Sequence, residues 1–195
     1  MALIRKRASA PRSEAREGVL AAGASDRLAG AAHYEVADAD RWIFVNDGAV
    51  AADADVVVPL ARLVAETDAI FARPGRTGVR LPNDRGLDAV VPHLSRLALI
   101  AIEIPKFGDG RGYSLARLLR ERHAFTGEIR AVGNVLRDQL LYLHRSGFDA
   151  FELDPKFGPG GLDPVAALAA FDELPVYYQA AADVRLPLWK RVARS

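Results

Sequence analysis

A glycine-rich loop with two cationic side chains is the strongest chemical signal in the sequence. Lys106 and Arg111 supply positive charge, and glycines at alternate positions let the backbone approach a ligand closely. A helix starting after the expected N-cap Ser114 would add free N–H groups and the positive end of its dipole. We therefore expect the loop to bind an anion. The predicted contacts are Lys106, Gly108, Gly110, Arg111, Gly112 and Ser114.

The spacing of these glycines does not indicate a nucleotide. Gly-x-Gly-x-Gly differs from the Gly-x-Gly-x-x-Gly of dinucleotide folds, and no Gly-Lys-Ser/Thr follows as in a P-loop. The tetrapeptide Pro-Lys-Phe-Gly occurs at residues 105–108 and again at residues 155–158. Lys156 is therefore a further candidate contact for an anion.

Two carboxylates near the loop could exchange protons with a bound ligand. Glu103 lies in the apolar segment before the loop, and Asp109 lies within the loop. Both are candidate acid/base residues. The alternative interpretation is a tight strand-to-helix turn in which Asp109 and Arg111 pair with each other. The sequence leaves open whether there is catalysis at all.

Each of the four expected strands has a charged residue with apolar residues on either side. The charged residues are Arg80, Glu103, Arg130 and Glu152. Equivalent positions on neighbouring parallel strands share a face, so these residues could form a cross-strand ion ladder, with helices on the other face. The ladder is either a structural network of paired charges or the lining of a pocket.

Short apolar strands alternate with amphipathic helices from about residue 78 onward. The strands are expected at residues 79–81, 99–104, 128–132 and 148–153. The helices are expected at residues 87–97, 114–123, 135–146 and 163–174. This alternation predicts four consecutive βα units in a parallel α/β sheet.

The part of the chain before these repeats is less regular. Residues 41–45 read as a strand followed by a turn, and residues 54–65 as a helix. Residues 1–32 have no steady periodicity and are expected to form an irregular N-terminal arm. Residues 33–195 are expected to form a single α/β domain.

Four βα units in sequence order indicate half of a (β/α)8 barrel, because a complete barrel typically needs about 250 residues and the chain has 195. An open doubly wound sheet is the alternative. The inner face of a half-barrel needs cover, which the N-terminal extension, the residues from 176 onward or a second copy of the chain in a homodimer could provide.

Composition excludes several classes of function. The chain has no cysteine, which rules out disulfides, zinc sites with thiolate ligands and cysteine-ligated iron–sulfur clusters. A net charge of +1 does not favour a nucleic-acid partner. The histidines lack metal-ligand spacing, and no apolar run is long enough to cross a membrane or to act as a secretory signal. We expect a cytoplasmic protein without a metal site.

Three segments resemble a bacterial family catalogued as domain of unknown function 934. They are KFGDGRGYSLARLLR at 106–120, GEIRAVGNVLRDQ at 127–139 and GFDAFEL at 147–153. The resemblance extends over about residues 78–180. The family motif after the third strand usually has Gly-Asp-Val-Leu, whereas this chain has Asn134 in place of the aspartate.

The resemblance implies a role in assimilatory sulfite reduction, because the family is labelled an oxidoreductase of that pathway. Its members are commonly encoded beside sulfite reductase, which makes that enzyme the expected partner. Without cysteine the chain cannot hold a cluster, so electron transfer would need a cofactor such as a flavin. We therefore expect an accessory protein that supports or docks to sulfite reductase. The alternatives are a small flavin-dependent oxidoreductase and a half-barrel enzyme acting on an anionic metabolite.

Overall fold

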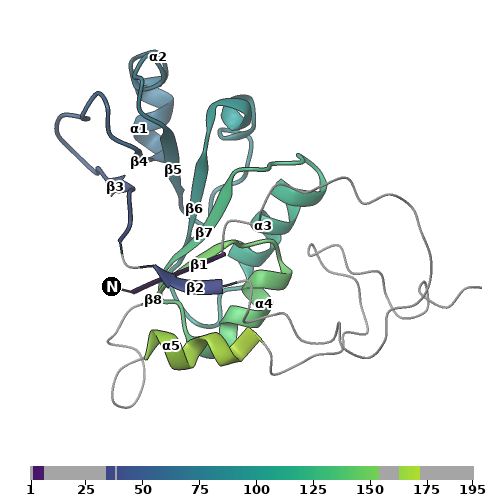
Figure 1. Cartoon of the computed structure of the whole chain (residues 1–195). Coiled ribbons are helices and arrows are strands. Elements are labelled where there is room, and N and C mark those ends of the chain that lie inside the picture. The colour runs from purple at the N-terminus through teal and green to yellow at the C-terminus, as the bar shows by residue number, and fades with distance from the viewer. Residues whose placement is uncertain (1, 7–33, 38, 154–162, 172–195) are drawn as a thin grey trace, which may run out of the picture.

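The computed structural model describes residues 2–6, 34–37, 39–153 and 163–171, and within them eight strands form one sheet (Figure 1). The order across the sheet is β2-β1-β8-β7-β6-β5-β4-β3. The strands are β1 (Ala2–Lys6), β2 (Tyr34–Ala37), β3 (Ile43–Phe44), β4 (Val56–Pro59), β5 (Thr77–Leu81), β6 (Leu99–Ile104), β7 (Glu128–Gly133) and β8 (Ala150–Leu153).

Strands β3 to β8 are parallel and follow the order of the sequence, as the alternating pattern predicts. Strands β1 and β2 form an antiparallel pair, and β1 pairs antiparallel with β8. The sheet is open and strongly curled, so the domain is an α/β half-barrel.

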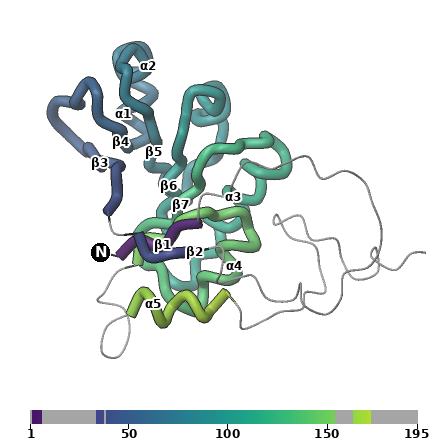
Figure 2. Tube along the Cα trace, viewed as in Figure 1, coloured from purple at the N-terminus to yellow at the C-terminus, as the bar shows by residue number. Residues whose placement is uncertain are grey.

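Helices lie around the outside of the curved sheet (Figure 2). They are α1 (Leu60–Ala65), α2 (Thr67–Phe71), α3 (Arg111–Glu121), α4 (Leu140–Arg145) and α5 (Pro164–Ala167), with 3₁₀ segments at Val91–Arg96, Arg137–Gln139 and Leu168–Phe171. Alternate strand residues such as Val79, Ile102 and Phe151 pack with helix residues such as Leu63 and Leu119 in the main core. No helix in the described part of the chain is long and apolar enough to cross a membrane.

The short connection between the two edge strands explains the curl. Eight strands laid flat would place β2 and β3 about 34 Å apart at about 4.8 Å per strand. The chain takes only six residue steps from Ala37 to Ile43, which span at most about 21 Å. The sheet must therefore bend until its edges approach.

Residues 39–42, which we call the crossing segment, contact the concave face near its amino end. Asp40 pairs with the guanidinium of Arg130 on β7. Trp42 packs in a small apolar cluster on this face, together with Val57, Leu99, Ala101 and Val132. The N-terminal part of the chain thus provides one of the covers expected for a half-barrel.

Two expectations about the first half of the chain are wrong. Residues 2–6 form β1 within the sheet rather than part of an irregular arm; the rest of the predicted arm, residues 7–33, lies outside the described residues. The expected helix at 54–65 begins only at Leu60, because the preceding β-branched Val56–Pro59 segment forms β4.

The first and third helices of the repeats are shorter than expected, whereas the second, α3, begins three residues earlier than expected. The first is a 3₁₀ segment at Val91–Arg96 with proline in its first turn. The third divides into a 3₁₀ turn and α4. The fourth is described up to Phe171, so the last residues of its predicted range lie outside the described structure.

Substituting Arg130 should destabilise the fold. Arg130→Met leaves the carboxylates of Asp40 and Glu128 without their cation, and we expect the free energy of unfolding to fall by about 2–3 kcal/mol in urea denaturation. Breaking a fully buried pair would cost more, but these carboxylates are 31% and 25% exposed. Arg117→Met, which removes an exposed pair with Glu121 on α3, is the control and should cost under about 0.5 kcal/mol. Equal effects of the two substitutions would contradict this role for Arg130.

Candidate functional site

The four charged residues of the predicted ladder share the concave face but lie in two rows. Arg80 and Arg130 are both in register with Ala101, one on each side of β6. Glu103 lies two residues further along β6, and Glu152 lies two residues beyond Ala150, the register partner of Arg130. The two cations thus occupy one row and the two carboxylates the next row toward the carboxyl end.

Only part of this set is joined directly in the described structure. Arg80 and Glu103 form an ion pair, with 2.5 Å between Nε and Oε1. Arg130 pairs instead with Asp40 and Glu128, outside the predicted ladder. Burial raises the pKa of Glu152, although the charges of Arg130 and Arg80 act in the opposite direction. Glu152 is therefore in the electrostatic field of both cations.

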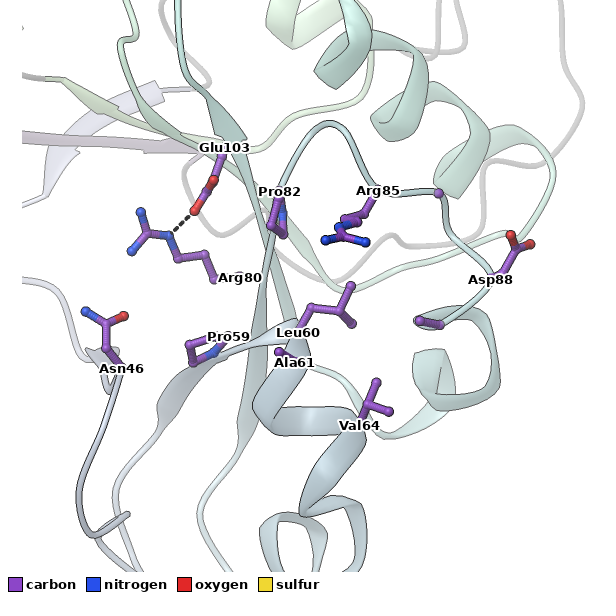
Figure 3. Close-up of a pocket in the computed structure, with 12 residues that line it drawn as sticks. Asn46, Pro59, Leu60, Ala61, Val64, Arg80, Pro82, Arg85, Asp88 and Glu103 are labelled. Atoms are coloured by element: carbon purple, nitrogen blue, oxygen red, sulfur yellow. Dashed lines mark ion pairs between the residues drawn. The ribbon is translucent and has the colours of Figure 1, made fainter.

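A pocket of about 770 Å³ opens near the carboxyl ends of β3 to β6 (Figure 3). Arg80 and Glu103 reach it from the concave face of the sheet, and Asn46 reaches it from the segment after β3. Leu60 and Val64 of α1 form an apolar wall. Ligands of parallel α/β sheets bind at this end of the strands, so we treat the pocket as the candidate site.

Arg80 is oriented to receive a ligand. Glu103 contacts its Nε, and the two terminal nitrogens point away from this carboxylate, toward the side of the pocket where Asn46 lies (Figure 3). Within the described residues these two nitrogens have no hydrogen bond or ion pair. The Arg80 side chain is 40% exposed. A guanidinium held through one nitrogen and open at the other two can bind a carboxylate, sulfonate or phosphate in a bidentate manner.

A carboxylate of the glycine-rich loop, Asp109, accepts hydrogen bonds at the start of α3. Asp109 accepts hydrogen bonds from Nε of Arg111 at 2.9 Å and from a terminal nitrogen at 2.6 Å. The backbone N–H of Arg111 also donates to Asp109, at 3.2 Å. This is the geometry of the alternative interpretation, a strand-to-helix turn closed by an ion pair. Binding of an external anion by the loop remains a prediction.

The other loop residues have separate roles. Helix α3 begins at Arg111, so Ser114 lies in the helix and is not its N-cap, contrary to expectation; Gly110 holds the N-cap position. A Cβ on Gly112 would lie 2.7 Å from Cδ1 of Ile104, so this glycine permits close packing of α3 on β6. Gly108 is exposed, and a Cβ there would meet nothing within 4 Å. Lys106 is also exposed.

The second Pro-Lys-Phe-Gly copy, with Lys156, lies outside the described residues. Among the residues that the structure does describe, no three acidic or histidine side chains gather as metal ligands.

The environments of the two candidate acid/base residues differ. Hydrogen bonds from Arg111 hold the pKa of Asp109 well below its ordinary value, so Asp109 is ionised at neutral pH and is a poor proton donor. Glu103, in contrast, lines the pocket beside Arg80. The structure therefore makes Glu103 the better candidate for proton exchange with a ligand.

Sequence reasoning missed the residues that complete the pocket. Asn46 follows a two-residue edge strand, and Arg85 belongs to the loop after β5. The signal was available for Arg85, because polar loops at the carboxyl ends of parallel strands are the usual ligand-binding positions. No local signal connects either residue with α1.

The family model described as bacterial protein of unknown function (DUF934) matches residues 78–189, more than half of the chain. The chain belongs to the DUF934 family. No curated protein and no solved structure matches the chain. The DUF934 match begins within β5 and includes Arg80, Glu103 and the glycine-rich loop. Asn46, α1 and the crossing segment precede it, so the pocket combines the matched region with the part before it.

The Asp109 ion pair should make stability depend on pH. Asp109→Asn keeps an oxygen for the backbone N–H of Arg111 but removes the charge, so we expect lower stability at pH 7. The pKa of Asp109 is lowered from 3.8, so the carboxylate's contribution is present above that pH and lost as the pH falls toward the folded-state pKa. In urea denaturation, the difference in the free energy of unfolding between wild type and Asp109→Asn should therefore decrease below pH 3.8. Asp53→Asn, on an exposed loop, is the control. If this difference in the free energy of unfolding does not depend on pH, the charge of Asp109 is not what stabilises the turn.

Proposed function

We propose that this DUF934 protein binds a small anion in the Arg80 pocket and acts as an accessory protein of sulfite reduction in the cytoplasm, docking to sulfite reductase. The observation that carries the binding part is the orientation of Arg80. Its Nε pairs with Glu103, and its terminal nitrogens point toward the side of the pocket where Asn46 lies, near the carboxyl ends of the strands.

Arg80 is prepared for this role before a ligand arrives. Pairing with Glu103 restricts the rotation of a side chain that otherwise has many conformers, so less entropy is lost on binding. Arg85 adds a second cation to the lining of the same pocket. A bidentate anion at Arg80 would replace water on both terminal nitrogens with charge-assisted hydrogen bonds.

The accessory role is supported by the sequence. The segments at 106–120, 127–139 and 147–153 resemble a family linked to sulfite reductase. A chain without cysteine cannot hold the iron–sulfur cluster through which such electrons normally pass. Supporting the reductase, rather than replacing part of its electron pathway, fits both facts.

A second candidate is an enzyme acting on the bound anion, and the position of Glu103 favours it. Its carboxylate lies beside the cation that would hold the ligand, within the same pocket. A ligand bound to the terminal nitrogens of Arg80 would come close to this carboxylate, which could accept or donate a proton there.

Removing Arg80 should weaken anion binding at the pocket. Calorimetric titration with sulfite, sulfate and phosphate should show affinities about 10- to 100-fold weaker for Arg80→Ala, the loss expected for charged hydrogen bonds. Arg80→Lys, which keeps the charge but not the planar fork, should be intermediate. Arg122→Ala, at the exposed end of α3, is the control. Unchanged anion affinity in Arg80→Ala would place the anion elsewhere.

Docking to sulfite reductase can be tested separately. Analytical ultracentrifugation of the full chain mixed with the reductase should show a complex at micromolar concentrations. Failure to associate would contradict the accessory role while leaving anion binding intact. A visible spectrum of the freshly purified protein tests the flavin alternative, since bound flavin absorbs visible light and the accessory role requires none.

A further inference from the structure

We propose that the ligand of the Arg80 pocket is an organic monoanion with an apolar body, a carboxylate or sulfonate, rather than an inorganic oxyanion. This inference rests on the proposed binding of an anion at Arg80. It adds the chemical class of the ligand and the direction in which the ligand lies.

The wall contributed by β4 and α1 is apolar. Leu60 and Val64 are four residues apart on α1 and therefore lie on the same side of the helix. Pro59, Ala61 and Pro82 extend this apolar lining. Val64 is 53% exposed although it is a large aliphatic residue. An oxyanion contacting Arg80 alone would leave this wall facing water, whereas an apolar ligand body would cover it.

The pocket separates a polar end from the apolar wall. Figure 3 places Arg80 with Glu103 and Asn46 on one side, while Leu60 and Val64 lie further along the pocket, on the same side as Arg85 and Asp88. A ligand that contacts Arg80 with its anionic group and covers Leu60 and Val64 with its apolar body would span the pocket from β5 to α1. The volume of about 770 Å³ lies in the range of roughly 300–1,000 Å³ that is usual for pockets holding small organic ligands.

The charges of the lining indicate one negative group on the ligand rather than several. The lining holds two cations, Arg80 and Arg85, and two carboxylates, Glu103 and Asp88, so its four charged residues sum to zero. A polyphosphate would need an excess of cations, because each uncompensated charge near a low-dielectric wall is costly. A single carboxylate or sulfonate needs only the fork of Arg80.

A series of alkylsulfonates from methanesulfonate to hexanesulfonate tests the proposal, because all members share one head group. Calorimetric titration of the full chain should show affinity rising with chain length, by up to about fourfold per buried methylene. Sulfite and sulfate should bind no more tightly than methanesulfonate.

Two valine variants locate the apolar contact. Val64→Ser should flatten the dependence on chain length, so that the ratio of hexanesulfonate to methanesulfonate affinity falls. Val165→Ser is the matched control, because Val165 is also an exposed valine, at 66%, but lies on α5 outside the pocket. It should leave the whole series unchanged. Both side chains are largely exposed, so neither substitution should prevent folding.

The outcomes separate this inference from the proposed function. Affinity that depends on Arg80 but not on chain length would overturn the organic ligand and leave anion binding standing. Affinity that rises with chain length equally in wild type and Val64→Ser would also overturn it, because the apolar contact would then lie elsewhere. If no member of the series and no inorganic anion binds, both proposals fail.

Discussion

The buried guanidinium of Arg130 is the interaction on which the shape of this half-barrel depends. Its side chain is 2% exposed, and a charge so far from water is tolerated only with close partners. Glu128 provides one partner from the same strand, and Asp40 provides the other from the crossing segment. Because that segment runs between the two edges of the sheet, the pair with Asp40 fixes the connection that keeps the sheet curled. Trp42 then covers the apolar floor beside it.

Two arginines in one row of the sheet consequently have different roles. Arg130 lies beneath the crossing segment and is surrounded by carboxylates, whereas Arg80 lies beyond it with one carboxylate on Nε. Ala101 between them is small, which leaves room for both side chains. The crossing segment thereby covers the concave face around Arg130 on the β7 side, whereas the face around Arg80 on the β5 side borders the pocket that can hold a ligand. The two interpretations of the charge pattern, structural network and pocket lining, therefore apply to opposite sides of β6 on one face.

Much of the fold could be predicted from the sequence because it depends on local periodicity. The strand at 99–104, the parallel order of the repeats and the common face of Arg80, Glu103, Arg130 and Glu152 all follow from alternating βα units. The place of β1 could not be predicted, since it pairs with β8 nearly 150 residues away and five residues carry too little pattern. The role of Asp40 could not be predicted either, because its partner Arg130 is 90 residues away in the sequence.

The candidate site could be predicted only in part. The glycine spacing indicated the 106–114 loop, but it could not show that Asp109 would accept the hydrogen bonds of Arg111 at the start of α3. The pocket joins the segment after β3, α1 and the loop after β5, and only the tertiary structure brings these together.

The central claim is that the anion binds at Arg80 and not at the glycine-rich loop. Arginine Nε–Hε NMR of the ¹⁵N-labelled chain, titrated with benzenesulfonate, reports on each guanidinium separately. We expect the Arg80 signal to shift and reach saturation while the signals of Arg111 and Arg130 do not shift. A shift of the Arg111 signal without a shift of the Arg80 signal would contradict binding at Arg80 and would place the anion at the glycine-rich loop.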